Sequence, residues 1–278
     1  MKISIIIPTK NSAKTLSLCL KSIVMQTYPK RKYEVIIVDG YSTDGTIDIA
    51  KQYGCKIIFS NKKPLGARLE GLKVAKGDII VFLDADHIIK RPNLLDDIER
   101  TIDKGIDMVH LEEHTFKPRT LIQKLIAADK KTMQDISYRL NPLHGVLYPR
   151  VFRRNVVEKA YKNIPLVFLW NVYEHEEAIL FYECLKISKK FASIKNALYH
   201  VDVDTFVEFF KKISKYGSMD MQVKRFSRYI PIIRRKQFFR LKEIPYLLLY
   251  KEDGVKTLIL LMLRVIAYNY GKIRRHGL

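Results

Sequence analysis

Four short apolar runs, rich in Ile and Val, alternate with helix-like segments along the first hundred residues. They are residues 3–7, 34–38, 56–59 and 78–83. Nearly continuous apolarity is typical of strands buried on both faces of a sheet. Alternation of such strands with helices predicts a parallel sheet covered by helices, and therefore an α/β fold.

Three helices are predicted between these strands from their capping residues. Asn11 or Ser12 can cap the first helix, and Asp44 can cap the second. The third helix, near residues 65–75, is expected to end at Gly77, where glycine makes a left-handed cap easy. All three helices would lie between consecutive strands.

The pattern is less regular in the second half of the chain. We expect a helix and a strand over residues 92–110, a helix over 121–133, a strand near 146–152, a helix from about 174 to 186, and a strand ending at His200. This predicts a division into a first half (1–110), a second half of the same domain (111–204) and an extension (205–278).

The extension is strongly basic and amphipathic. It holds 17 Lys and Arg against five Asp and Glu, which is +12 of the chain's net +21. Its apolar segments at 246–250 and 258–267 have basic flanks, and neither reaches the roughly 20 apolar residues of a membrane-spanning helix. Helices lying in an anionic membrane surface and ordinary packing in a helical subdomain both fit this pattern.

Composition narrows the class of protein further. With 278 residues and 47% hydrophobic residues, the chain can bury a substantial core and is not disordered. A net charge of +21 favours phosphate-rich partners: nucleic acid, anionic lipid or a nucleotide substrate. Three cysteines without metal-like spacing, and a first apolar run too short for a signal peptide, favour a cytoplasmic location.

Polar residues follow three of the predicted strands directly. The sequences are Pro8-Thr9-Lys10-Asn11, Asp39-Gly40-Tyr41-Ser42 and Asp84-Ala85-Asp86. Ligands of open α/β sheets bind at the carboxyl ends of the strands, so these residues are candidates for a binding site. Glycine-rich dinucleotide and P-loop motifs are absent from the sequence.

Asp84 and Asp86 stand out because two like charges so close together resist joint ionisation. A hard divalent cation, Mn²⁺ or Mg²⁺, would neutralise them and leave positions open for substrate phosphates. Capping of the next helix is the alternative role. Asp39 can accept a hydrogen bond from a nucleobase ring, and Arg68, at a helix start, suits a diphosphate or is a solvated surface charge.

Taken together, four segments resemble the family 2 glycosyltransferases. They are Ile-Ile-Pro-Thr-Lys-Asn at 6–11, Val-Asp-Gly-Tyr-Ser-Thr-Asp-Gly-Thr at 38–46, Gly-Ala-Arg at 66–68 and Gly-Asp-Ile-Ile-Val-Phe-Leu-Asp-Ala-Asp at 77–86. The resemblance implies a GT-A fold. It implies that the nucleotide of a UDP- or GDP-sugar donor is surrounded by Pro8, Thr9, Asn11, Asp39 and Arg68, with Asp84, Ala85 and Asp86 at the nucleoside and the metal-bound diphosphate. Leu69 and His87 depart from the usual residues.

The same resemblance suggests a general base. Family members carry a Glu-Asp pair at a helix start, and Glu176-Glu177-Ala178-Ile179-Leu180 is similar, which places Glu177 at the base position. Glu176 and Glu174 are neighbouring candidates. An acidic cluster that only caps the helix is the alternative.

Further site residues follow from the resemblance. His200 takes the place of a metal- or diphosphate-contacting histidine, or makes a structural hydrogen bond. Arg150, Arg153, Arg154 and His144 are implied near the acceptor, or belong to a solvated turn.

The resemblance implies an inverting, metal-dependent glycosyltransferase with a hydroxyl acceptor on a glycan or lipid-linked glycan. A polyprenyl-phosphate acceptor, a nucleotidyltransferase and a nucleic-acid-binding protein are the alternatives. Carboxylates at the sheet edge would repel a nucleic-acid backbone, so no nucleic acid is expected. We expect a peripheral protein on the cytoplasmic face of a membrane.

Overall fold

The chain forms two compact units that are interleaved in the sequence. The structure is a computed structural model, and it describes residues 2–140, 147–172, 176–224, 229 and 244–276. The sheet unit comprises Met1–Glu113, Tyr148–Val172 and Glu176–Val201, and the helical unit comprises His114–Leu147, Tyr173–His175 and Asp202–Leu278. Segment 111–204, predicted to be one acceptor half, thus contributes to both units.

The sheet unit contains an eight-stranded sheet of order β3-β2-β1-β4-β7-β6-β8-β5 within the described residues. The strands are β1 Ile3–Thr9, β2 Tyr33–Asp39, β3 Lys56–Phe59, β4 Ile79–Phe82, β5 His87–Ile89, β6 Met108–Thr115, β7 Val151–Arg153 and β8 Phe191–His200. Strands β1 to β4 pair in parallel, whereas β4–β7, β6–β7 and β5–β8 pair antiparallel. The predicted α/β fold is confirmed.

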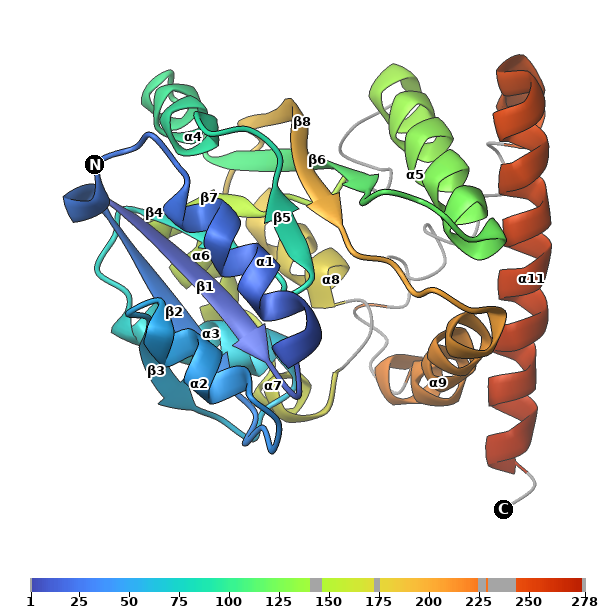
Figure 1. Cartoon of the computed structure of the whole chain (residues 1–278), viewed down its shortest axis with the longest axis horizontal. Helices are drawn as coiled ribbons and strands as arrows, with labels where there is room; N and C mark the ends of the chain where they lie inside the picture. The colour runs from blue at the N-terminus through green and yellow to red at the C-terminus, as the bar shows by residue number, and fades with distance from the viewer. Residues whose placement is uncertain (1, 141–146, 173–175, 225–228, 230–243, 277–278) are drawn as a thin grey trace. The chain divides into compact units, whose positions relative to one another are not determined.

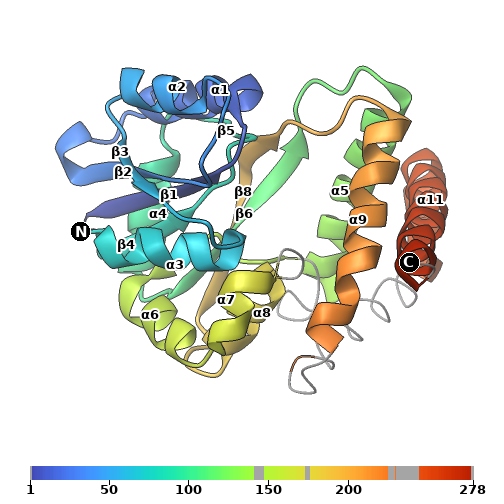
Figure 2. The same ribbon diagram turned by 90° about the horizontal axis from the view of Figure 1, so that it is seen from below.

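Helices cover both faces of this sheet (Figure 2). They are α1 Ala13–Val24, α2 Thr46–Gln52, α3 Pro64–Val74, α4 Leu94–Asp103, α6 Arg154–Lys162, α7 Leu166–Asn171 and α8 Glu176–Leu185, with a 3-10 turn at Lys30–Lys32. Alternate residues of β1, namely Ile3, Ile5 and Ile7, share one core with α1, α2 and α4. On the other face, Gly71 of α3 lies directly against Ile6, where a side chain would clash.

Asp44 holds the starts of two helices together. Its Oδ2 accepts the Ala13 N–H of α1 at 3.0 Å, and its Oδ1 accepts the Thr46 N–H of α2 at 3.0 Å. Asp44 therefore accepts a backbone N–H at the start of each helix, but the N-cap of α2 is Gly45, one residue after the predicted cap. Ser12 occupies the N-cap of α1, but its side chain makes no capping hydrogen bond.

Two details of the sequence prediction are wrong. The cap of α3 is Ala75 in an extended conformation, and Gly77 does not have a positive φ. Gly77 is instead required for close approach, since a Cβ would lie 2.6 Å from the Lys2 carbonyl oxygen. Strand β3 is an edge strand, so its residues are half-buried or exposed rather than buried on both faces.

The helical unit is built from three long helices that lie side by side (Figure 1). These are α5 Leu121–Leu140, α9 Phe206–Lys224 and α11 Lys251–His276, with a 3-10 turn at Leu248–Tyr250. The α9 and α11 backbones pack closely where Gly217 meets Tyr268 and Gly271 meets Ser214. The helix predicted at 121–133 is confirmed but extends to 140, and the apolar segment 258–267 lies within α11. Within the described residues, every helix is too short or too polar to cross a bilayer.

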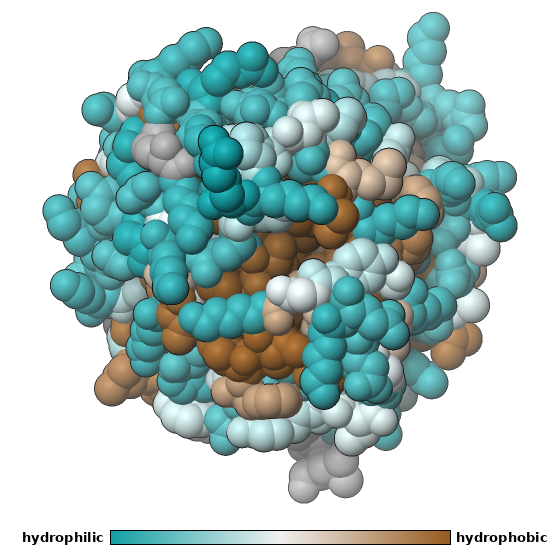
Figure 3. All heavy atoms as spheres, turned by 60° about the vertical axis from the view of Figure 1, so that its left-hand side comes forward, coloured by the Kyte–Doolittle hydropathy of each residue, from teal (hydrophilic) through white to brown (hydrophobic). Residues whose placement is uncertain are grey.

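Hydrophilic side chains cover most of the surface visible in Figure 3, and hydrophobic side chains gather near its middle. This agrees with the 50 Lys and Arg of the chain, which are costly to bury. The arginines that are buried therefore require specific partners.

Candidate functional site

Asp84 lies between two buried arginines at the end of β4. Arg68 of α3 places Nη2 2.7 Å from Asp84 Oδ1, and Arg150, just before β7, places Nη1 3.0 Å from Asp84 Oδ2. Arg68 is 2% exposed and Arg150 9% exposed. Burial opposes ionisation of Asp84, but the two guanidinium groups hold its pKa well below the usual range. The positive charge that neutralises Asp84 is thus supplied by Arg68 and Arg150.

The same arginines reach three more carboxyl groups. Arg150 lies 2.8 Å from Glu177 Oε1 through Nη1 and 2.8 Å from Glu113 Oε1 through Nε, and Arg68 Nη1 lies 3.6 Å from Glu176 Oε1. We call Arg68, Asp84, Glu113, Arg150, Glu176 and Glu177 the ion cluster. Its four carboxyl groups outnumber its two cations.

Glu176 differs from the other acids of the ion cluster in its proton affinity. Burial raises its pKa to about 7, against the attraction of Arg68 and with further help from Glu177. Glu176 is therefore protonated for part of the time near neutral pH. Glu177, the predicted base, pairs with Arg150.

A group that can hold a metal ion lies beside the ion cluster. Asp86, His87 and His200 each offer one ligand atom, and these atoms lie within 4.8 Å of one another. His87 and His200 are directly paired across β5 and β8, with ring centroids 5.3 Å apart. Asp86 Oδ1 is buried without a hydrogen-bond partner in the described part of the chain, and Asp86 Oδ2 lies 3.4 Å from His200 Nε2.

These donors fit a divalent cation. Carboxylate ligands suit Mn²⁺ and Mg²⁺, and imidazole is a common metal ligand. A buried carboxylate oxygen without a hydrogen-bond partner is the kind of atom that a cation satisfies. His87 Nδ1 already accepts the Asp84 N–H at 2.9 Å, and its Nε2 lies 3.3 Å from Glu113 Oε1. Asp86 and His200 are thus the better-placed ligands, and Asp84 faces the arginines instead.

The residues predicted around the nucleotide hold two loops together. Asp39 is fully buried and accepts hydrogen bonds from Thr9 Oγ1 and Ser42 Oγ, each at 2.7 Å. Asn11 Oδ1 accepts the Thr43 N–H at 2.8 Å. Asp39, Thr9 and Asn11 therefore link the carboxyl ends of β1 and β2, next to Pro8 in β1, and their contact with a nucleobase stays a prediction.

Sequence reasoning missed an aromatic pair at this edge. Tyr41 and Phe59 stack with ring centroids 5.5 Å apart and are 58% and 53% exposed. Tyr41 follows Gly40 after β2, whereas Phe59 ends β3, so only the pairing of the two strands brings the rings together. The signal available in the sequence was an aromatic residue at each strand end.

The predicted acceptor-side residues separate into two groups. Arg150 joins the ion cluster. Arg153 pairs with Ile79 at the beginning of β4 and donates to Asp107, and Arg154 donates to the Gly77 carbonyl, so both lie at the opposite end of β4 from Asp84. His144 and Glu174 lie outside the described residues.

Comparison with known proteins gives the family. The sequence profile of glycosyl transferase family 2 matches residues 4–160, more than half of the chain. An uncharacterized glycosyltransferase of Haemophilus influenzae is 29% identical over 260 residues, covering 91% of this chain and 96% of that protein. A poly(ribitol-phosphate) beta-glucosyltransferase of Bacillus spizizenii is 43% identical over 103 residues, which is 34% of this chain and only 16% of that relative.

A solved structure shows the same fold. Glucosyl-3-phosphoglycerate synthase from Mycobacterium tuberculosis, in complex with Mn²⁺, UDP-glucose and phosphoglyceric acid, matches with a TM-score of 0.55 at 19% identity, covering 80% of this chain and 76% of that one. The shared fold is consistent with the matched family profile. This chain therefore belongs to glycosyl transferase family 2.

Proposed function

We propose that this enzyme transfers a sugar from a UDP- or GDP-linked donor to a hydroxyl acceptor, with inversion at the anomeric carbon. The observation that carries the proposal is the adjacency of the ion cluster to the metal-competent group of Asp86 and His200. Donor diphosphates carry charge that a cation held by Asp86 and His200 would neutralise, and both features lie at the sheet edge where such ligands bind.

Asp86 and His200 would hold the cation, Mn²⁺ or Mg²⁺. When bound, the cation would offset the negative charge of the departing nucleoside diphosphate. Arg68 anchors Asp84, which keeps the strand end rigid beside that position. The Mycobacterium tuberculosis neighbour, solved with Mn²⁺ and UDP-glucose, supports this choice of cofactor and donor.

Glu177 is proposed as the general base. The adjacent Glu176, with a pKa raised to about 7, is partly protonated near neutral pH, so we assign the role of base to Glu177, which pairs with Arg150. Glu177 takes the acceptor proton while the acceptor oxygen bonds to the anomeric carbon. The bond from that carbon to the diphosphate breaks, and its electron pair leaves with the diphosphate.

The excess of carboxyl groups in the ion cluster supports a hydroxyl acceptor, on a glycan or a lipid-linked glycan, rather than a polyprenyl phosphate. An anionic acceptor would approach Glu113 and Glu177, and like charges repel. A hydroxyl, in contrast, needs a base.

Peripheral association with the cytoplasmic face of an anionic membrane completes the proposal. The +12 charge of residues 205–278 supports it, because cationic segments bind anionic lipid headgroups.

Thermal melting with UDP, GDP and their sugars, each with and without Mn²⁺, tests the donor and the cation. We expect one nucleotide class to raise the melting temperature, and to do so more with Mn²⁺, because ligands that bind only the native state stabilise it. Proton NMR of the transferred sugar then tests inversion. A folded protein whose melting temperature no nucleotide changes would contradict the proposal.

A further inference from the structure

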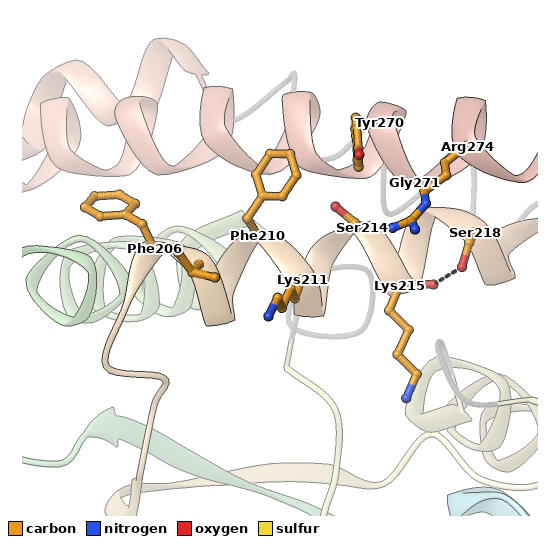
Figure 4. Close-up of a pocket in the computed structure, with 10 residues that line it drawn as sticks. Phe206, Phe210, Lys211, Ser214, Lys215, Ser218, Tyr270, Gly271 and Arg274 are labelled. Carbon is orange, nitrogen blue, oxygen red and sulfur yellow. Dashed lines mark hydrogen bonds between the residues drawn. The ribbon is translucent and has the colours of Figure 1, made fainter.

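Within the helical unit, α9 and α11 border a groove of about 870 Å³ (Figure 4). Phe206 and Phe210 of α9 and Tyr270 of α11 line it, and the rings of Phe210 and Tyr270 lie 5.4 Å apart. Figure 4 shows Arg274 extending from α11 toward α9. The groove therefore has an open, aromatic wall.

Cations line the same groove. They are Lys211, Lys215 and Arg274, and the described lining residues include no acid. Lys211 and Arg274 are exposed. A ligand of this groove should therefore combine an apolar part with a negative charge.

An exposed apolar stripe on α11 continues from the groove. Its residues, spaced three or four apart, are Val255, Ile259, Met262, Ile266, Tyr270 and Ile273, and each is between 39% and 72% exposed. The opposite face of α11, with Gly254, Leu260 and Ala267, is buried within the helical unit. A helix of 26 residues at 1.5 Å per residue is about 39 Å long, so the stripe is extensive. Exposed apolar surface of this kind marks an interaction site.

We propose that the groove and the stripe seat this protein on anionic phospholipid of a membrane surface. Lipid phosphates lie against Lys211 and Lys215 on α9 and against Arg274 on α11, and the first part of an acyl chain lies along Phe206, Phe210 and Tyr270. The stripe lies at the boundary between headgroups and acyl chains, as amphipathic surface helices do. The inference rests on the proposed membrane association and is independent of the donor chemistry.

Charge decides between a membrane and a second copy of the chain. Pairing two copies through this face would bring together two patches that each carry Lys211, Lys215 and Arg274. Like charges repel at that distance, whereas an anionic bilayer attracts them at about 1 kcal/mol per Lys or Arg near the surface. Anionic lipid is the complementary occupant.

Vesicle co-sedimentation of the full chain tests the cationic part. The vesicles contain phosphatidylcholine alone or with phosphatidylglycerol. We expect Lys211→Glu with Arg274→Glu to weaken binding to the anionic vesicles by roughly thirtyfold or more. Lys51→Glu with Lys162→Glu changes the net charge equally on exposed lysines of α2 and α6, and should weaken binding much less.

Fluorescence tests the apolar part. In Ile266→Trp, vesicles with brominated acyl chains should quench emission well beyond the quenching seen for wild type, whose single tryptophan is Trp170. Met262→Asn with Ile266→Asn should weaken vesicle binding at least tenfold, whereas Leu18→Asn with Val24→Asn, on exposed positions of α1, should not.

Each outcome is decisive. Failure of wild type to bind anionic vesicles overturns both the membrane association and this surface. If the groove variant and the stripe variant both bind anionic vesicles as wild type does, the groove and the stripe are overturned but membrane association is not. Loss of self-association in Ile266→Asn by sedimentation velocity, without any vesicle binding, would identify a second copy as the occupant and also overturn the proposal. Nucleotide-induced melting shifts should be unchanged in all variants, which separates these results from the donor chemistry.

Discussion

Arg150 and Asp84, which are 66 residues apart in the sequence, form a partly buried ion pair with Arg150 Nη1 3.0 Å from Asp84 Oδ2. The same guanidinium contacts Glu113 of β6 and Glu177 of α8. One side chain therefore balances acids that come from three parts of the sheet unit. Its position ties the end of β4 to the helix that carries the proposed base.

Replacing Arg150 with Met should lower the free energy of unfolding by about 1–3 kcal/mol, because three partly buried acids lose their shared cation. Urea denaturation measures the change. Arg100→Met is the control: Arg100 also pairs with an acid, Asp97, but its side chain is 67% exposed, so the loss should stay below about 1 kcal/mol. Equal losses in the two variants would contradict a central role for Arg150.

Asp86→Asn should remove the metal-dependent part of donor binding. Since Asp86 supplies the anionic ligand, we expect Mn²⁺ affinity to fall by roughly a hundredfold or more, as measured by calorimetry with the matching nucleoside diphosphate present. Asp48→Asn, on an exposed residue of α2, should bind Mn²⁺ as wild type does. Wild-type Mn²⁺ binding by Asp86→Asn would exclude this site.

Glu177→Gln should reduce kcat by about 10²- to 10⁴-fold while donor affinity is retained, because it removes the base and little else. Glu176→Gln resembles protonated Glu176 and should keep most of the activity. In wild type, titration of Glu176 with its pKa of about 7 should change the rate near neutral pH. This change should be absent from the pH profile of Glu176→Gln. If Glu176→Gln is instead the inactive variant, the two roles are reversed.

His110 should make stability depend on pH. Burial lowers the pKa of His110 in the folded chain to about 4, whereas an unfolded histidine titrates near its ordinary value of 6.5. Between these values the unfolded chain binds a proton that the folded chain does not. Stability is therefore full above pH 6.5 and falls as the pH drops toward 4, by up to about 1.4 kcal/mol per pH unit.

Urea denaturation at several pH values between 7 and 4.5 compares wild type with His110→Asn. The variant should show a smaller slope of stability against pH, whatever its absolute stability. Parallel slopes would show that His110 is protonated equally in both states.

The first half of the fold was accessible from the sequence because its signals are local. Strands β1 to β4 are short apolar runs, and Asp44 lies two residues before the start of α2. Ligands of open α/β sheets bind at the carboxyl ends of the strands, and Asp84 and Asp86 follow such an end. Their place at the sheet edge was therefore predictable. The exposure of β3 could not be predicted from its sequence, because a strand lies at the edge only when no other strand pairs with its second side.

The sequence by itself determined the family, the α/β class and the acidic residues at the strand ends. Only the tertiary structure decided that Arg68 and Arg150 neutralise Asp84, that His87 meets His200 across β5 and β8, and that Arg153 points to the other end of β4. The antiparallel pairs β4–β7 and β5–β8 join segments that are far apart in the sequence, and this pairing places those residues. The register of such pairs depends on packing and charge across the whole sheet unit, and no local spacing encodes it.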